Sequence, residues 1–223
     1  MTAQSGRVNK AAFSRGSQFD WGWLTIMAAC SVVALALKGA LLWSHAFPFN
    51  ADEAVVGLMA KHILAGERPV FFYGQAYLGS LDAWLVAGAM AALGPRVAAI
   101  RVVQSVLFVG TVATTFLLGR KIYRRRWVAA VGALLLAVPP VLVTLYTTVS
   151  LGGYGEVLLL GNILLLITLR IGEHTPAETP ARYWLGFGLL AGIGFWGFGL
   201  LAVYIAPGVA FLLWRELRSP HPR

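Results

Sequence analysis

The sequence predicts an all-α, polytopic membrane protein, and two observations decide this fold class. Of the 223 residues, 58% are hydrophobic and 12% are charged, whereas soluble globular chains have about 45–50% apolar and about 25% charged residues. The net charge of +9 lies mostly in short clusters between apolar runs, which is typical of the cytoplasmic loops of membrane proteins. This pattern excludes a soluble nucleic-acid-binding module. The single cysteine, Cys30, excludes an internal disulfide framework and a multi-cysteine metal site.

Six transmembrane helices are predicted from the apolar runs, because a span needs roughly 20 apolar residues. They are expected at 21–43, 97–119, 128–147 and 157–171, with a tight pair inside 183–214. The consecutive prolines Pro139 and Pro140 are expected to kink the third span. Lys38 lies one turn from the outer end of the first span, so its side chain is expected to extend outward to the water.

The segment 44–96 is more polar and is predicted to hold two juxtamembrane helices. The first covers 51–65, where Asn50 is a plausible N-cap and Glu53 follows it by three residues, as in a capping box. The second covers 78–93 and is short for a membrane span. Asp82, within it, and Glu67, before it, are expected to be solvated.

The topology depends on whether 78–93 crosses the bilayer. Five positive charges in 120–126 predict a cytoplasmic loop, and the N-terminus is also basic. These two signals agree only if 78–93 lies in the outer interface. We therefore expect a cytoplasmic tail at 1–20, a single membrane domain at 21–215 and a cytoplasmic end at 216–223. The expected location is a bacterial-type plasma membrane, with the N-terminus in the cytoplasm.

Three strings in the first outer loop resemble a known pattern. They are FNADE at 49–53, AKHILAG at 60–66 and YGQAYLGS at 73–80, and the later LGGYGE at 151–156 and GIGFW at 192–196 add to them. The strings are similar to those of GT-C glycosyltransferases that use lipid-phosphate sugars, in the protein mannosyltransferase-like and aminoarabinose transferase-like branch. Ala76 departs from the pattern, since relatives often carry proline there. Family members are also longer, so the resemblance implies an N-terminal module or a shortened relative.

The resemblance implies transfer of a sugar from a polyprenyl-phosphate donor to a hydroxyl acceptor on the outer face. In this interpretation the acidic pair of Asp52 and Glu53 is catalytic, with Asp52 as general base. A positioned base is worth typically 10²–10⁴-fold in rate. Cations placed against the departing phosphate would stabilise its growing charge. The residues expected to bind the lipid phosphate or the sugar are Lys61, His62, Tyr73, Gln75, Tyr77 and Arg101, and Glu156 forms a second acidic site.

Each of these residues also has a structural interpretation. Asp52 and Glu53 suit the first turn of a helix through its dipole. Lys61 and His62 fit a solvated helix face, and Arg101 could reach ordinary lipid phosphates from its span. The tyrosines at 73 and 77 fit an interfacial aromatic belt, and Glu156 fits an interfacial charge.

No cofactor is expected, because a monophosphate leaving group does not require a metal, although two carboxylates could hold a divalent ion. The expected partners are a polyprenyl-phosphate-linked sugar and membrane lipid, together with a missing C-terminal half or partner subunit, and no nucleic acid. Two other function classes stay open. One is a non-catalytic or truncated membrane subunit of the same fold. The other is a small transporter, which would carry ionisable groups in mid-span and inverted repeats.

Overall fold

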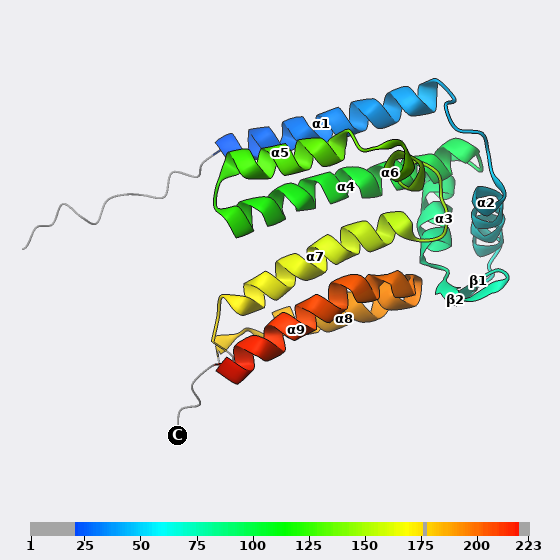
Figure 1. The fold of residues 1–223 in the computed structure, drawn as a ribbon. Coiled ribbons are helices and arrows are strands. Elements are labelled where there is room, and N and C mark those ends of the chain that lie inside the picture. The colour runs from blue at the N-terminus through cyan, green and yellow to red at the C-terminus, as the bar shows by residue number, and fades with distance from the viewer. Residues whose placement is uncertain (1–20, 176–177, 219–223) are drawn as a thin grey trace, which may run out of the picture.

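The computed structural model describes residues 21–175 and 178–218, and most of the described chain is helical. The long helices of the bundle run side by side, as Figure 1 shows, and they are α1 (Gly22–Trp43), α4 (Val97–Tyr123), α5 (Arg126–Ala137), α7 (Tyr154–Gly172), α8 (Ala181–Gly197) and α9 (Ala202–Arg218). A short helix α6 (Val141–Tyr146) follows α5, and a 3-10 turn η3 (Gly199–Leu201) joins α8 to α9. The expected tail at 1–20 and the last five residues lie outside the described residues.

The predicted all-α membrane fold is confirmed. Four described helices are long and apolar enough to cross a membrane, and they are α1, α4, α7 and the 199–218 segment that contains α9. The 17-residue helix α8 and the 12-residue helix α5 are shorter. The Lys/Arg-rich turn at 120–126 lies at the opposite end of the bundle from α2 (Ala51–Leu64) and α3 (Leu81–Leu93), as Figure 1 shows. The direction in which this bundle crosses the membrane stays a prediction from the charges.

The third predicted span is interrupted rather than kinked. Helix α5 ends at Ala137 and α6 starts at Val141, so both Pro139 and Pro140 lie between the two helices. A proline has no backbone N–H to donate and its ring clashes with the preceding turn, and two in succession end the helix. Pro140 is the N-cap of α6, and its carbonyl accepts the first hydrogen bond of that helix, from the Thr144 N–H at 2.9 Å.

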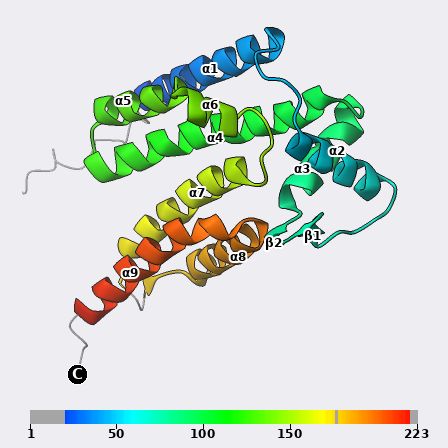
Figure 2. The same ribbon diagram turned by 45° about the vertical axis from the view of Figure 1, so that its right-hand side comes forward.

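Helices α2 and α3 lie across one end of the bundle, as Figures 1 and 2 show. The Asn50 side chain accepts a hydrogen bond from the Glu53 N–H at 2.9 Å, which confirms the N-cap of α2. Helix α3 has 13 residues, so at 1.5 Å per residue it is about 20 Å long and too short for a hydrocarbon core of about 30 Å.

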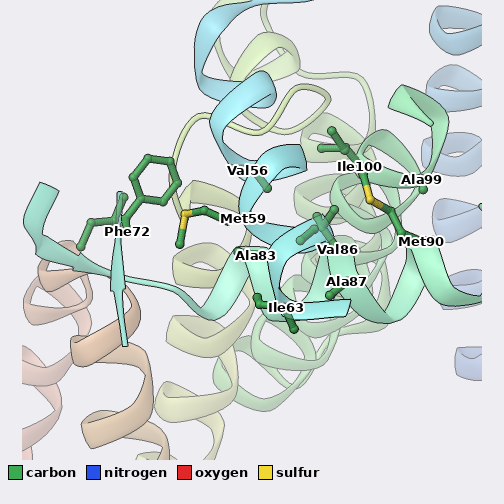
Figure 3. Packing of buried hydrophobic residues seen from close by; sticks show 12 residues of the cluster. Val56, Met59, Ile63, Phe72, Ala83, Val86, Ala87, Met90, Ala99 and Ile100 are labelled. Carbon is green, nitrogen blue, oxygen red and sulfur yellow. The ribbon is translucent and has the colours of Figure 1, made fainter. Parts of the chain in front are cut away.

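A compact apolar core joins these two helices to the start of α4. Its buried side chains interdigitate in Figure 3, where Val56, Met59 and Ile63 of α2 meet Ala83, Val86, Ala87 and Met90 of α3 and Ala99 and Ile100 of α4. Burying apolar side chains stabilises the folded state by about 25 cal/mol for each Å² of apolar surface removed from water. Helices α2 and α3 are therefore packed as one unit on α4, which fixes their position at the end of the bundle.

A small hairpin that the sequence patterns do not predict connects α2 to α3. Its strands β1 (Phe71–Phe72) and β2 (Gln75–Gly79) pair antiparallel, with Phe72 opposite Gln75. Leu78 forms an isolated bridge with Phe198, so the hairpin also contacts the turn after α8. Gly79 permits this approach, because a Cβ there would lie 2.4 Å from the Trp196 carbonyl oxygen. The second outer helix accordingly begins at 81 and not at 78.

Lys38 does not extend outward to the water, and that prediction is wrong. Its side chain is fully buried, and its Nζ lies 2.7 Å from Thr147 Oγ1, 2.6 Å from Thr148 Oγ1 and 4.3 Å from the centroid of the Phe108 ring. The threonine hydroxyls supply hydrogen-bond acceptors inside the bundle, so the amino group does not need water. These contacts hold α1 against the chain just after the Pro139–Pro140 interruption.

Replacing Thr148 with valine is expected to destabilise the protein by about 1–3 kcal/mol, because a buried donor on Lys38 loses an acceptor. Thermal unfolding of the purified protein measures this effect. Thr25→Val is the matched control, since that hydroxyl is exposed and bonds only within α1. Adding Lys38→Met to Thr148→Val is expected to restore most of the lost stability. If Thr148→Val destabilised the Lys38→Met protein as much as it destabilises the unmodified protein, this account would be contradicted.

Candidate active site

A pocket of about 170 Å³ lies at the end of the bundle where α2, the hairpin, the loop before α7 and the turn after α8 meet. Its lining is Asp52, Phe72, Gln75, Tyr77, Leu78, Leu151, Gly152, Tyr154 and Phe198. The Tyr154 ring packs edge-on against Tyr146, with centroids 4.6 Å apart, and against Phe198, with centroids 5.2 Å apart. Aromatic faces and a few polar groups, together with one carboxylate, therefore surround the pocket.

Asp52 lies in the first turn of α2 with an exposed side chain. Within the described part of the chain, its carboxylate forms no ion pair and no side-chain hydrogen bond, while its neighbours Gln75 and Tyr77 line the same pocket. Both oxygens of this carboxylate are thus free to accept a hydrogen bond or a proton from a molecule in the pocket. Three sequence-predicted site residues, Asp52, Gln75 and Tyr77, are brought together here.

Glu53 points the other way and is fully buried. Its two carboxylate oxygens accept hydrogen bonds from Arg101, from Nε at 3.0 Å and from Nη2 at 2.9 Å. Arg101 also donates to the carbonyl oxygens of Phe47 at 3.0 Å and Pro48 at 3.2 Å. Neither Glu53 nor Arg101 lines the pocket. The pair instead clamps the segment before α2 onto α4, and so fixes the place where Asp52 emerges.

Lys61, His62 and Tyr73 lie outside the pocket lining. Tyr73 contacts His62, with 3.0 Å between Oη and Nδ1, and donates a hydrogen bond to Glu67 at 2.8 Å. This hydrogen bond to Glu67 raises the pKa of the Tyr73 hydroxyl. Lys61 is exposed on α2. The last turn of α2 and the hairpin thus form a second polar cluster, separate from the pocket.

Glu156 and Asp82 are both buried, each with 4% of its surface exposed. The expectation that Asp82 is solvated is therefore wrong. Gln104 Nε2 donates to Asp82 at 3.0 Å, and the Ser150 hydroxyl donates to its other oxygen. These donors make burial tolerable for a carboxyl group. Both acids line a small cavity adjoining the pocket, with Phe72, Leu78 and Gly152 in the lining of both.

Sequence reasoning assigned no role to six residues of the pocket lining, namely Phe72, Leu78, Leu151, Gly152, Tyr154 and Phe198. Leu151 and Tyr154 belong to the LGGYGE string at 151–156, so a residue-by-residue use of that string would have found them. Phe198 had no such signal. Among residues 21–175 and 178–218, no group of three or more His, Cys, Asp or Glu side chains is arranged to hold a metal ion.

The family model for dolichyl-phosphate-mannose-protein mannosyltransferases matches residues 79–223, which is more than half of the chain. The chain belongs to this mannosyltransferase family. The GT-C-type resemblance is thereby confirmed, and the protein is a multi-pass membrane protein of a glycosyltransferase family. No curated protein and no solved structure matches the chain.

The mannosyltransferase family match contains the part of the pocket contributed by Leu151, Gly152, Tyr154 and Phe198. It also contains Arg101 and the buried pair of Asp82 and Glu156. Asp52, Gln75 and Tyr77 precede the matched segment. The pocket thus forms where the matched part of the chain meets α2 and the hairpin that precede it.

Proposed function

We propose that this chain transfers a sugar from a polyprenyl-phosphate donor to a hydroxyl acceptor on the outer face of the plasma membrane. It does so either alone or as the N-terminal module of a larger enzyme. The observation that carries the proposal is the unpaired carboxylate of Asp52 at an aromatic pocket in a mannosyltransferase-family chain. Carboxylates of this kind act as general bases toward hydroxyl groups. The pocket is lined by residues of α2 and of the hairpin that joins α2 to α3.

The proposed step moves one proton, forms one carbon–oxygen bond and breaks another. The hydroxyl proton of the acceptor passes to Asp52 while the acceptor oxygen bonds to the anomeric carbon of the sugar. The bond between that carbon and the phosphate oxygen breaks, and its electron pair leaves with the lipid phosphate. Gln75 and Tyr77 carry hydrogen-bonding groups suited to sugar hydroxyls, and the rings of Tyr154 and Phe198 supply apolar faces for the sugar.

The other predicted residues have different places in this proposal. Lys61 and His62 are the candidates for contact with the lipid phosphate, because they lie on α2 outside the buried core, and Tyr73 is linked to His62. Arg101 and Glu53 act by holding the start of α2 and not by touching the substrate. Glu156 lies in the cavity beside the pocket and supports its wall.

A transfer assay tests the proposal. Membrane vesicles containing the full chain are supplied with a sugar-labelled polyprenyl phosphate and with hydroxyl-bearing acceptors, and vesicles without the chain serve as the control. We expect the label to leave the polyprenyl phosphate and appear on an acceptor only when the chain is present. If the label stays on the polyprenyl phosphate although the folded chain binds it, the chain is a non-catalytic subunit instead.

A further inference from the structure

The cavity that adjoins the pocket contains two carboxyl groups and no side chain of opposite charge. Its volume is about 10 Å³ and its lining includes Asp82 and Glu156, so it has room for about one water-sized group. Asp82 has two hydrogen-bond donors, but neither oxygen of Glu156 has a hydrogen-bond partner. Glu156 is thus a buried acid without a hydrogen-bond partner, and it lines this cavity.

The groups that face this pair come from every neighbouring element, and all of them are neutral. Helix α4 contributes Gln104, the loop before α7 contributes Ser150 and two glycines, and the hairpin contributes Phe72, Leu78 and Gly79. Leu81 and Gly197 complete the lining. Across the described residues, no Lys, Arg or His side chain forms an ion pair with either acid.

Two helix N-termini meet at this cavity. Asp82 lies in the first turn of α3 and Glu156 in the first turn of α7. Each helix N-terminus is equivalent to roughly +0.5 of an elementary charge, so together they offset about one of the two negative charges. A second uncompensated charge in a closed apolar space would be expensive. One additional positive charge is therefore required.

We infer that Asp82 and Glu156 share one proton, and that this carboxylic acid–carboxylate pair fastens the start of α7 to α3. The shared proton gives Glu156 the hydrogen bond that it lacks and removes the second charge. Ca²⁺ or Mg²⁺ suits the site less well, because these ions take six or more oxygen ligands and the remaining lining is apolar side chains and glycine. Burial raises the pKa of Asp82, in agreement with a retained proton.

The shared proton would position the wall of the candidate pocket. Leu151, Gly152 and Tyr154 lie between Ser150 and Glu156 in the chain, and all three line the pocket. Fixing both ends of this short segment fixes the wall. This role in the pocket rests on the proposed function, whereas the sharing of a proton does not.

The test is the pH dependence of thermal unfolding for the full purified chain and its Glu156→Gln variant. Above about pH 4, where the free carboxyl groups of the unfolded chain lose their protons, a folded protein that keeps the shared proton binds more protons than the unfolded chain. Stability from the pair therefore falls as the pH rises. We expect the melting temperature of the unmodified protein to fall by about 3 °C more than that of Glu156→Gln between pH 5 and pH 8.

Infrared spectroscopy gives a second measurement that does not depend on a variant folding. The unmodified protein should show a protonated-carboxyl band at neutral pH, and Glu156→Gln and Asp82→Asn should each change it, while Glu173→Gln, on an exposed pair at the other end of α7, should not. A missing band, or a pH-independent difference in melting temperature, would overturn the inference. So would a melting temperature raised by Ca²⁺ or Mg²⁺ alone in the unmodified protein but not in Glu156→Gln. None of these measurements uses transferase activity, so failure of the proposed function leaves them valid.

Discussion

Replacing Asp52 with asparagine is expected to lower the rate of sugar transfer by about 10²–10⁴-fold, the usual contribution of a general base. Asparagine has nearly the same shape but does not accept the acceptor's proton. Because the Asp52 side chain is exposed and lines the pocket, its replacement should leave the melting temperature nearly unchanged. The rate is measured as label transferred from the polyprenyl phosphate, at equal amounts of folded protein.

Glu173→Gln is the matched control for Asp52→Asn. It removes one carboxylate at the opposite end of the bundle, where Glu173 pairs with Lys121 and Arg170, and it should leave transfer unaltered. Binding of the donor should survive in Asp52→Asn, since the proposed role is on the acceptor. Full transfer by Asp52→Asn would remove Asp52 as the base, whereas an equal loss in both variants would indicate a general defect in the membrane preparation.

The sequence is most informative where the signal is local. The N-cap at Asn50 and the two short outer helices follow from residues within a few positions of one another, and the structure has both features. The position of Asp52 after the first span also follows from the chain order. The hairpin between the outer helices was missed, because its first strand has only two residues and a strand of that length has no alternating pattern.

The different roles of Asp52 and Glu53 could not be predicted from the residues next to them in the sequence. Successive residues on a helix are about 100° apart, so one of Asp52 and Glu53 can face the core while the other faces the pocket. Which one faces inward depends on Arg101, 48 residues along the chain. The same is true of Lys38, whose threonine partners lie 109 and 110 residues away. Asp82 was expected in water, but its partner Ser150 is 68 residues distant along the chain.

Breaking the buried ion pair is expected to be the most damaging single change to stability. In Glu53→Ala the Arg101 guanidinium stays buried, with 8% of its side chain exposed, and keeps only the Phe47 and Pro48 carbonyls as partners. Leaving one member of a buried ion pair without its partner costs about 3–5 kcal/mol of stability. This loss lowers the melting temperature by roughly 6–20 °C in a protein of this size. Thermal unfolding in the same detergent as the unmodified protein measures the loss.

The double variant Glu53→Leu/Arg101→Met separates a stabilising pair from a catalytic one. Removing both charges avoids the buried unpaired ion, so most of the stability should return. Transfer should nevertheless stay reduced, because no group then holds the carbonyls at 47 and 48 that place Asp52 at the pocket. If Glu53→Gln abolished transfer and left the melting temperature unchanged, Glu53 would act on the substrate directly. If the double variant were as unstable as Glu53→Ala, the loss would come from packing around α2 and not from an uncompensated charge.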